Sequence, residues 1–433
     1  MKIALPREPH RRAAWASVAV AALVAATAPW LSHRRAEARM SPNLTVTSGA
    51  DDGRGSLRQA VLAADRADGF ARIDIRVPRI VLESPLPPLV NAHGVLITGG
   101  ATVAELDASQ TGGAALDVAS PNSSVQRLRI ITARTGVVVR ATNVRLTELQ
   151  IDDADVGVLA GAGADGLAIE RSAFRRNRIG VQNADGGRAQ VSATRFEDHA
   201  LAAIWAVSTR APSEMAVLDS RFLNDAGGVV LVNRSARVEL NEFNGMRETA
   251  VLVTTGRAIV RANRIRSGRG FGVLLDRVAS ATVYRNEIAN NCAGGVMVRH
   301  AQAADVLSNE LYTNGFGIIV LDSARGGPYL VADNLVMNHQ QDGVMLIGSS
   351  PLVRGNRLLQ NSQAGLRLSV LVRDGERLPA SPRLDGNVLR GNGRDEPLRD
   401  SYDASVTSPA SAPPTDCPWR GAPFDRQRPG PGR

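Results

Sequence analysis

Cysteine, aromatic residues and lysine are scarce in this sequence of 433 residues, and each shortage excludes a class of protein. Two cysteines, Cys292 and Cys417, are too few for a disulfide-rich scaffold, a four-cysteine zinc site or an iron–sulfur cluster. They allow one disulfide at most, and we expect two unpaired thiols. Aromatic residues make up 4% while glycine numbers 41, which favours short strands joined by tight turns.

The formal net charge of +9 is unevenly distributed along the chain. Residues 1–40 hold seven basic and two acidic side chains, residues 394–433 hold six of each sign, and residues 41–393 therefore carry a modest +4. Lys2 is the only lysine, and the arginines form no cluster with interleaved aromatic residues. We expect no nucleic-acid partner.

The N-terminal segment, residues 1–40, has the pattern of an export signal. Basic residues precede the apolar run Ala13–Leu31, and the small residues Ala26 and Ala28 offer a cleavage site. The alternative is an uncleaved membrane anchor, because ~19 apolar residues just span a bilayer. The sequence therefore predicts an extracytoplasmic protein (periplasmic, cell-surface or secreted), which contacts a membrane only if this segment is uncleaved.

The rest of the chain repeats a small residue followed by alternating apolar positions, at steps of 21 to 26 residues. The eleven pairs are Gly136-Val137, Gly157-Val158, Gly180-Val181, Ala203-Ile204, Gly228-Val229, Ala250-Val251, Gly272-Val273, Gly295-Val296, Gly317-Ile318, Gly343-Val344 and Gly365-Leu366. A fixed period in this range indicates a solenoid. Short stretches of period 2, rich in valine, isoleucine and phenylalanine, favour three strands per turn over a leucine-rich repeat. We predict an all-β, single-stranded parallel β-helix of about eleven coils, a rod of roughly 50 Å at ~4.8 Å per coil.

A second signature, polar-x-apolar, recurs between these pairs. Its apolar member is Phe174, Phe196, Phe222 and Phe243 in successive repeats, which predicts one interior column. Its polar member becomes asparagine from Asn241 onward; asparagine tolerates left-handed turn geometry, and stacked amides hydrogen-bond from coil to coil. We therefore expect structural asparagines rather than ligand-binding ones.

The two ends of the solenoid need protection, because an open strand edge promotes aggregation. Leu44–Thr47 reads as a strand, and Ser56 with Gln59 forms a capping box that opens a helix over Leu57 to Ala64. We assign residues 41–120 to an N-terminal cap and first irregular coils, 121–393 to regular coils, and 394–433 to a flexible tail rich in proline, serine and aspartate.

The cap and the Gly-Val coils together resemble secreted bacterial right-handed parallel β-helix proteins of the pectin-lyase-like superfamily. The resemblance covers about residues 41–393 and implies a right-handed coil. It implies little about activity, since the superfamily holds pectate lyases, polygalacturonases and alginate epimerases. The Gly-His-Gly and Asp-Pro-His-Asp signatures of its enzymes are absent, as is an acidic calcium-binding column. We expect neither a metal nor a cofactor.

One candidate catalytic cluster follows from position alone. Asp276, Arg299, His300 and Asp322 share an offset from three consecutive repeat glycines, so they are expected at one strand's exit. A histidine between carboxylates is a possible acid–base pair, and the resemblance implies active sites on that sheet's outer face. The alternative is an ordinary salt-bridged turn.

The residue two after each repeat glycine should point outward. This outward column is apolar over successive coils, and it supplies the candidate binding residues Trp205, Leu252, Leu274, Met297, Ile319 and Met345. Such a stripe exceeds the apolar patch usual for a monomer. Either the 394–433 tail covers it, through Trp419 and Phe424, or it is open to a partner.

Three functions remain open at this point. The first is an exported protein that binds, or also remodels, polysaccharide along one sheet face. The second is a polysaccharide lyase, epimerase or glycoside hydrolase. The third is a structural or adhesive protein that recognises a surface protein. We favour binding over catalysis, because enzyme motifs are absent.

Overall fold

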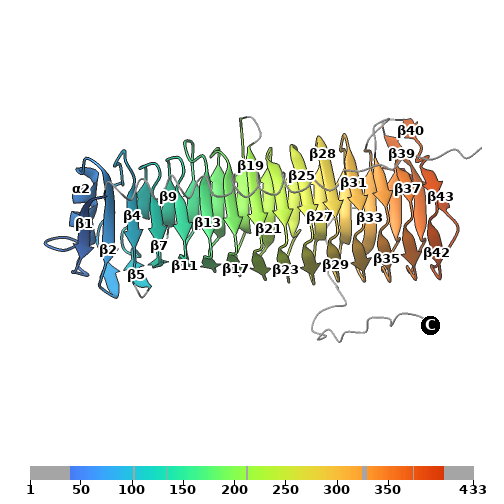
Figure 1. Ribbon diagram of the computed structural model, residues 1–433. Helices are drawn as coiled ribbons and strands as arrows, with labels where there is room; N and C mark the ends of the chain where they lie inside the picture. Colours follow the sequence, from blue (N-terminus) through green and yellow to red (C-terminus); the bar gives the residue numbers. More distant parts are fainter. Residues whose placement is uncertain are drawn as a thin grey trace, which may run out of the picture.

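The computed structural model describes residues 40–403 except 101–102, 133, 211–212, 324–328 and 374. These residues wind into a straight rod in which each turn adds one strand to each of three sheets (Figure 1). The structure has about 13 turns, against the eleven predicted. The difference arises because β6 and β43 lie before and after the eleven repeats that carry the glycine signature.

Sheet A contains fifteen parallel strands. Its strands in spatial order are β1 (Met40–Val46), β2 (Phe70–Ile75), β4 (Val95–Thr98), β7 (Ser124–Gln126), β10 (Arg145–Thr147), β13 (Leu167–Glu170), β16 (Ala189–Ser192), β19 (Glu214–Leu218), β22 (Ser235–Glu239), β25 (Arg257–Arg261), β28 (Ser280–Tyr284), β31 (Ala304–Leu307), β34 (Leu330–Ala332), β37 (Leu352–Arg354) and β41 (Arg383–Asp385).

Sheet B contains fourteen short parallel strands. They are β3 (Arg79–Val81), β5 (Ala104–Asp107), β8 (Leu128–Ile131), β11 (Gln150–Asp152), β14 (Ala173–Arg175), β17 (Arg195–Glu197), β20 (Arg221–Leu223), β23 (Glu242–Asn244), β26 (Arg264–Arg266), β29 (Glu287–Ala289), β32 (Glu310–Tyr312), β35 (Leu335–Met337), β38 (Arg357–Leu359) and β42 (Val388–Arg390).

Sheet C contains the repeat glycines and also has fourteen strands. They are β6 (Ala114–Val118), β9 (Thr135–Val139), β12 (Val156–Ala160), β15 (Ile179–Ala184), β18 (Ala202–Val207), β21 (Gly227–Val232), β24 (Val251–Thr254), β27 (Phe271–Asp276), β30 (Gly294–Arg299), β33 (Phe316–Leu321), β36 (Val344–Ile347), β39 (Leu366–Arg373), β40 (Glu376–Leu378) and β43 (Leu398–Asp403). All pair in parallel except β40, which forms an antiparallel hairpin with β39.

The interior of the rod is filled by aligned apolar columns, as the sequence predicted. Phe174, Phe196, Phe222 and Phe243 stack with ring centroids 4.4–5.2 Å apart and nearly parallel planes. The repeat glycines face this column: a Cβ on Gly157 would lie 2.8 Å from the Phe174 ring. Glycine therefore recurs because the sheets approach closely there, and the burial of each ring stabilises neighbouring coils.

The predicted asparagine column is confirmed as a buried hydrogen-bonded ladder. The side chains of Asn241, Asn263 and Asn286 follow one another, and each Nδ2 donates to the next Oδ1 at 2.9–3.0 Å. Each Nδ2 also donates to a backbone carbonyl oxygen, such as that of Val238. The expectation that these asparagines adopt left-handed geometry was wrong: the residue before each one does so, for example Leu240 at φ 61°.

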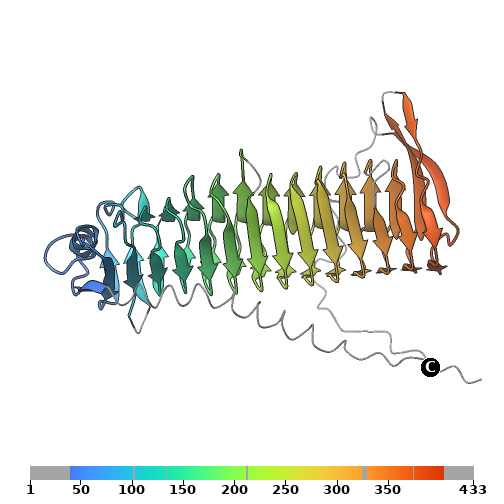
Figure 2. The ribbon, with the colours of Figure 1, turned by 45° about the horizontal axis from the view of Figure 1, so that its top comes forward.

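The N-terminal cap is also confirmed. The Ser56 hydroxyl accepts a hydrogen bond from the Gln59 N–H, and α2 (Leu57–Asp65) buries Leu57, Ala60, Val61 and Ala64 over β1 and β2. Figure 2 shows this helix closing one end of the rod. The tail assignment was wrong for its first residues, because β43 pairs with β39; residues 404–433 lie outside the described part.

Candidate functional site

The structure brings three of the four candidate catalytic residues together at the exit of sheet C. The Asp276 carboxylate is buried and lies 3.2 Å from Arg299 Nε and 3.2 Å from His300 Nδ1. Arg277 adds a third contact at 3.1 Å. The predicted proximity of Asp276, Arg299 and His300 is confirmed. Two guanidinium groups and the imidazole all contact the Asp276 carboxylate. This surrounding favours a salt-bridged corner over a free acid–base group.

The fourth residue, Asp322, lies one coil further along the same corner. His300 and Asp322 both adopt left-handed geometry, with φ of 53° and 42°. The His300 N–H donates to the Leu321 carbonyl, which precedes Asp322. The Asp322 carboxylate pairs with Arg373 of β39 at 2.6 Å. The predicted cluster is therefore two neighbouring ion-pair groups, and a catalytic role for its members stays a prediction.

The outward column of sheet C has the predicted register. Trp205 pairs along the sheet with Val230, then Leu252, Leu274, Met297, Ile319 and Met345 follow in successive strands. Met297 and Ile319 are 0% exposed and Leu274 is 9% exposed, whereas Trp205, Leu252 and Met345 are half-buried. The alternative in which Leu274, Met297 and Ile319 form an open binding surface is therefore wrong. The three side chains are buried in an apolar cluster that is separate from the core.

Cys292 corrects a further expectation, since its sulfur is in a disulfide and not a free thiol. The residue lies between β29 and β30, directly before Ala293, which packs against the second apolar cluster. Cys417 is the only other cysteine of the sequence and lies outside the described residues.

A second interior polar column at the corner between sheets B and C escaped the sequence analysis. It contains two histidines, His199 and His339, both fully buried. The Asn314 N–H donates to His339 Nδ1 at 3.0 Å, and burial lowers the pKa of His339 to about 3. His199 Nδ1 lies 2.6 Å from Asp225, whose pKa is raised by burial. A constant offset of five residues from the polar-x-apolar signature would have revealed this column.

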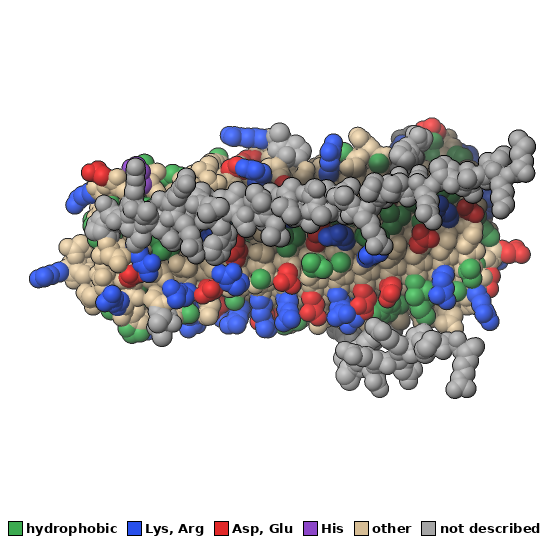
Figure 3. All heavy atoms as spheres, in the orientation of Figure 1, with side chains coloured by type: hydrophobic (Ala, Val, Ile, Leu, Met, Phe, Trp, Pro, Cys, Tyr) green, Lys and Arg blue, Asp and Glu red, His purple; other side chains and the backbone are tan. Residues whose placement is uncertain are grey.

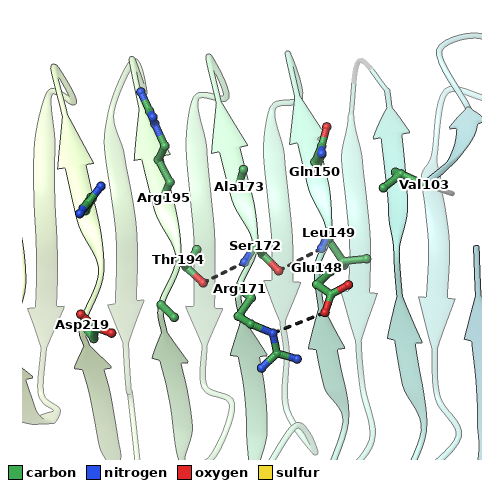
Figure 4. A pocket seen from close by; sticks show the side chains of 12 residues that line it. Val103, Glu148, Leu149, Gln150, Arg171, Ser172, Ala173, Thr194, Arg195 and Asp219 are labelled. Atoms are coloured by element: carbon green, nitrogen blue, oxygen red, sulfur yellow. Dashed lines mark hydrogen bonds and ion pairs between the residues drawn. The ribbon is translucent and has the colours of Figure 1, made fainter. Parts of the chain in front are cut away.

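An open groove runs along the opposite corner, where sheet A turns into sheet B. Figure 4 shows its first part, with a volume of about 590 Å³, where Arg171, Arg195 and Asp219 follow one another along the corner. A second part of about 380 Å³ begins at the same Asp219 and continues to Arg285. We call the two parts together the edge groove; it spans seven coils from Glu148 to Arg285.

The side chains of the edge groove are charged and exposed. Arg221 and Glu242 approach within 3.7 Å, and Arg264 pairs with Glu287 at 3.0 Å, so basic and acidic side chains alternate over these four coils. In Figure 3 basic and acidic side chains are mixed along the edge of the rod where the sheet B strands lie in Figure 1. The floor is uniform, because a two-residue linker joins the A and B strands in every one of these coils.

Comparison with known proteins identifies the fold. A family model described as right-handed beta helix region matches residues 211–362, and no curated protein matches. The catalytic unit of an α-1,3-glucanase from Streptomyces thermodiastaticus has a TM-score of 0.51 at 15% identity, over 85% of this chain and 71% of the other. The periplasmic alginate epimerase AlgG has a TM-score of 0.36 at 12% identity, over 84% and 91%.

The chain is a right-handed parallel β-helix. The predicted resemblance and fold class are confirmed, with structural neighbours among polysaccharide-acting enzymes. Within the described part of this β-helix, no group of three histidine, cysteine, aspartate or glutamate side chains is placed to hold a metal ion. Over the same residues, no helix has the length and apolar character to cross a membrane.

Proposed function

We propose that this β-helix is an exported protein that binds polysaccharide along the edge groove. The main observation in support is the shape of the groove. It is open, runs parallel to the rod axis and is formed by the same corner of seven coils. A linear polymer presents the same hydroxyl or carboxylate groups at each repeat. A groove that runs along the rod axis and presents charged side chains from several successive coils matches such a ligand better than it matches a small molecule.

The chemistry of the groove favours hydrogen bonding to hydroxyl and carboxylate groups. Arg171, Arg195 and Arg221 present guanidinium groups on three consecutive coils, interleaved with Glu148 and Asp219. Arginine forms bidentate hydrogen bonds with carboxylates, and neighbouring acids accept from sugar hydroxyls. Leu240, which is 60% exposed in the second part of the groove, adds an apolar contact. This mixture suits neutral or mildly acidic glycans.

Two observations support export. The first 40 residues have the pattern of an export signal. The disulfide at Cys292 suits an oxidising compartment, where disulfides persist. A periplasmic, cell-surface or secreted location follows from the proposal.

Binding is tested with the purified protein and a panel of polysaccharides: α-1,3-glucan, pectate, polygalacturonate and alginate. We expect co-sedimentation or a calorimetric signal with at least one of them, without new reducing ends or unsaturated uronate. Replacing Arg195 and Arg221 by alanine should weaken that binding at least tenfold, since each lost charged hydrogen bond is worth ~1.5–3 kcal/mol.

The matched control replaces Arg140 and Arg188 by alanine. Both are exposed and both pair with an aspartate, Asp117 and Asp165, but they lie outside the edge groove. The net charge changes equally in the two double variants. Equal loss of binding in both, or no binding by the parent, would contradict the proposal; product formation would instead support an enzyme.

A further inference from the structure

The outer face of sheet C carries an apolar cluster that is separate from the core of the rod. We call it the outer apolar cluster; its buried members are Phe271, Leu274, Met297, Ile319, Ile347 and Leu371. Leu252, Ala293, Phe316, Leu321, Met345 and Leu378 pack against them. These side chains lie on the face that points away from the interior, yet Met297 and Ile319 have no exposed surface. A layer of chain must therefore cover this face.

The described residues supply that layer at one end only. The β39–β40 hairpin contributes Leu371 and Leu378. Phe271 and Leu274 lie on β27, four strands from β39 along the sheet, which is about 19 Å at ~4.8 Å per strand. A three-residue strand such as β40 does not reach that far. Another segment of the chain has to cover the cluster near β27 and β30.

The disulfide at Cys292 indicates which segment this is. Its sulfur is bonded, and within one chain the only available partner is Cys417. Cys292 stands at the start of β30, two residues before Gly294, and the Phe271 ring lies over Gly294, 2.6 Å from the position of a Cβ there. A disulfide between Cys292 and Cys417 would therefore hold the residues next to Cys417 at the edge of the outer apolar cluster.

The length of the C-terminal segment allows this connection. Fourteen residue-to-residue steps separate Asp403, where β43 ends, from Cys417. They span up to about 46–50 Å when extended. The path from β43 back to β30 crosses four strand spacings, about 19 Å, and the width of a strand of six residues, about 20 Å. The segment reaches with length to spare.

We propose that a Cys292–Cys417 disulfide ties the C-terminal segment to sheet C, and that residues 417–424 cover the outer apolar cluster. Trp419 and Phe424 follow Cys417 by two and seven residues, so the disulfide holds both within reach of Phe271, Leu274 and Met297. Tryptophan and phenylalanine bring the largest apolar areas available to such a short segment. The outer face of sheet C is then an internal docking surface of the protein.

The covalent link is tested first, by peptide mapping of the full-length protein without reduction. We expect one crosslinked peptide pair that contains Cys292 and Cys417 and disappears on reduction. Alkylation of both cysteines in the unreduced protein would overturn the proposal.

The docking is tested by the fluorescence of Trp419. The full-length chain has three other tryptophans, so Trp15, Trp30 and Trp205 are replaced by phenylalanine. In the oxidised protein we expect blue-shifted, quencher-protected emission, and after Cys292→Ser a shift to longer wavelength. Long-wavelength emission in both forms means that Trp419 is in water, which contradicts docking.

Truncation identifies the cover of the cluster. A chain that ends at Asp403 should bind an apolar dye several-fold more strongly than the full-length protein, whereas a chain that ends at Asp425 should not, because it keeps residues 417–424. The apolar N-terminal run Ala13–Leu31 is the competing occupant. Equal dye binding by both truncations, with an increase only when residues 1–40 are removed, would assign the cover to that run and overturn the proposal.

Discussion

The outer face of sheet C and the edge groove lie on the same rod and have opposite characters. Sheet C presents Phe271, Leu274 and Met297 outward and buries them, while the edge groove presents Arg195 and Arg221 and leaves them in water. Both surfaces have one equivalent residue per coil. An apolar outward column thus marks a place where another layer of chain packs, and a charged column marks a surface that stays available to a ligand.

The largest effect should come from making the covered face polar. Replacing Leu274, Met297 and Ile319 together by serine should lower the free energy of unfolding by more than 5 kcal/mol, because large-to-small changes at buried apolar sites cost about 2–5 kcal/mol each. Thermal unfolding measures this. The control replaces Arg171, Arg195 and Arg221 by serine in the edge groove, where exposed ion pairs contribute little. Similar stability of both triple variants would mean that the cluster is not buried.

The next effect concerns the ladder beneath the edge groove. Asn263→Ala removes the partner of the Asn241 side chain and leaves the Val238 carbonyl without its amide donor. At about 1–3 kcal/mol per unsatisfied buried group, we expect a loss of about 3 kcal/mol in chemical unfolding. Asn387→Ala, at the half-buried end of the ladder, should cost clearly less. A larger loss at the end would contradict a ladder that is strongest in its middle.

A pH dependence separates the histidine behind the covered face from the exposed residues. His339 has a folded pKa of about 3, below its unfolded value near 6.5, so the unfolded state binds the proton first as the pH falls. Its contribution to stability is present above pH 6.5 and declines by about 1.4 kcal/mol per pH unit toward pH 3. His339→Asn should remove this slope relative to the parent. Parallel stability curves between pH 4 and 6.5 would show that His339 titrates normally.

The smallest effect should be a gain in stability at the floor of the edge groove. Leu240 holds a left-handed backbone conformation at φ 61° and is exposed, so glycine should relieve strain of about 1 kcal/mol. Leu240→Gly should raise the unfolding midpoint slightly and weaken glycan binding by removing the apolar contact. The comparison variant Ala262→Gly, at φ 53° in the same groove, tests the backbone effect alone. A lower midpoint for both would contradict the strain argument.

Most of the interior could be predicted from the sequence because each coil repeats it. Phe174 to Phe243, the asparagine ladder and the Ser56 cap depend on neighbours at a fixed offset, which a sequence displays directly. The alternation of strands also placed Leu274 and Met297 outward. It could not reveal that they are buried, since period 2 distinguishes the two faces of a sheet and not what lies beyond each face.

The sequence predicted where the candidate catalytic residues lie but not which side chains they contact. The shared offset of Asp276, Arg299 and His300 brought them to one corner, but the third contact, Arg277, and the distant partner of Asp322, Arg373, depend on side-chain direction. The edge groove was missed as a site because its arginines and glutamates appear in sequence as an ordinary solvated ladder. Its depth arises from the two-residue corner, which becomes visible only when seven coils are stacked.

From β10 onward, the length of the linker between strands is constant at one corner of the rod and variable at another. Two residues join β19 to β20, β22 to β23 and β34 to β35, whereas the passage from sheet C to sheet A takes two residues after β21, six after β18 and eight after β33. The asparagine ladder fixes the first kind of corner over many successive coils, whereas separate contacts hold the second, such as Arg234 donating to Asn183 Oδ1 and the Ser323 N–H donating to Ser349 Oγ. New loops can therefore be accepted at the C-to-A corner for a loop-closure cost that grows by only about 0.6 kcal/mol per doubling of length. Such loops would all stand on one side of the rod, beside Asp276 and His300, so recognition could diversify there without disturbing the asparagine ladder at the opposite corner.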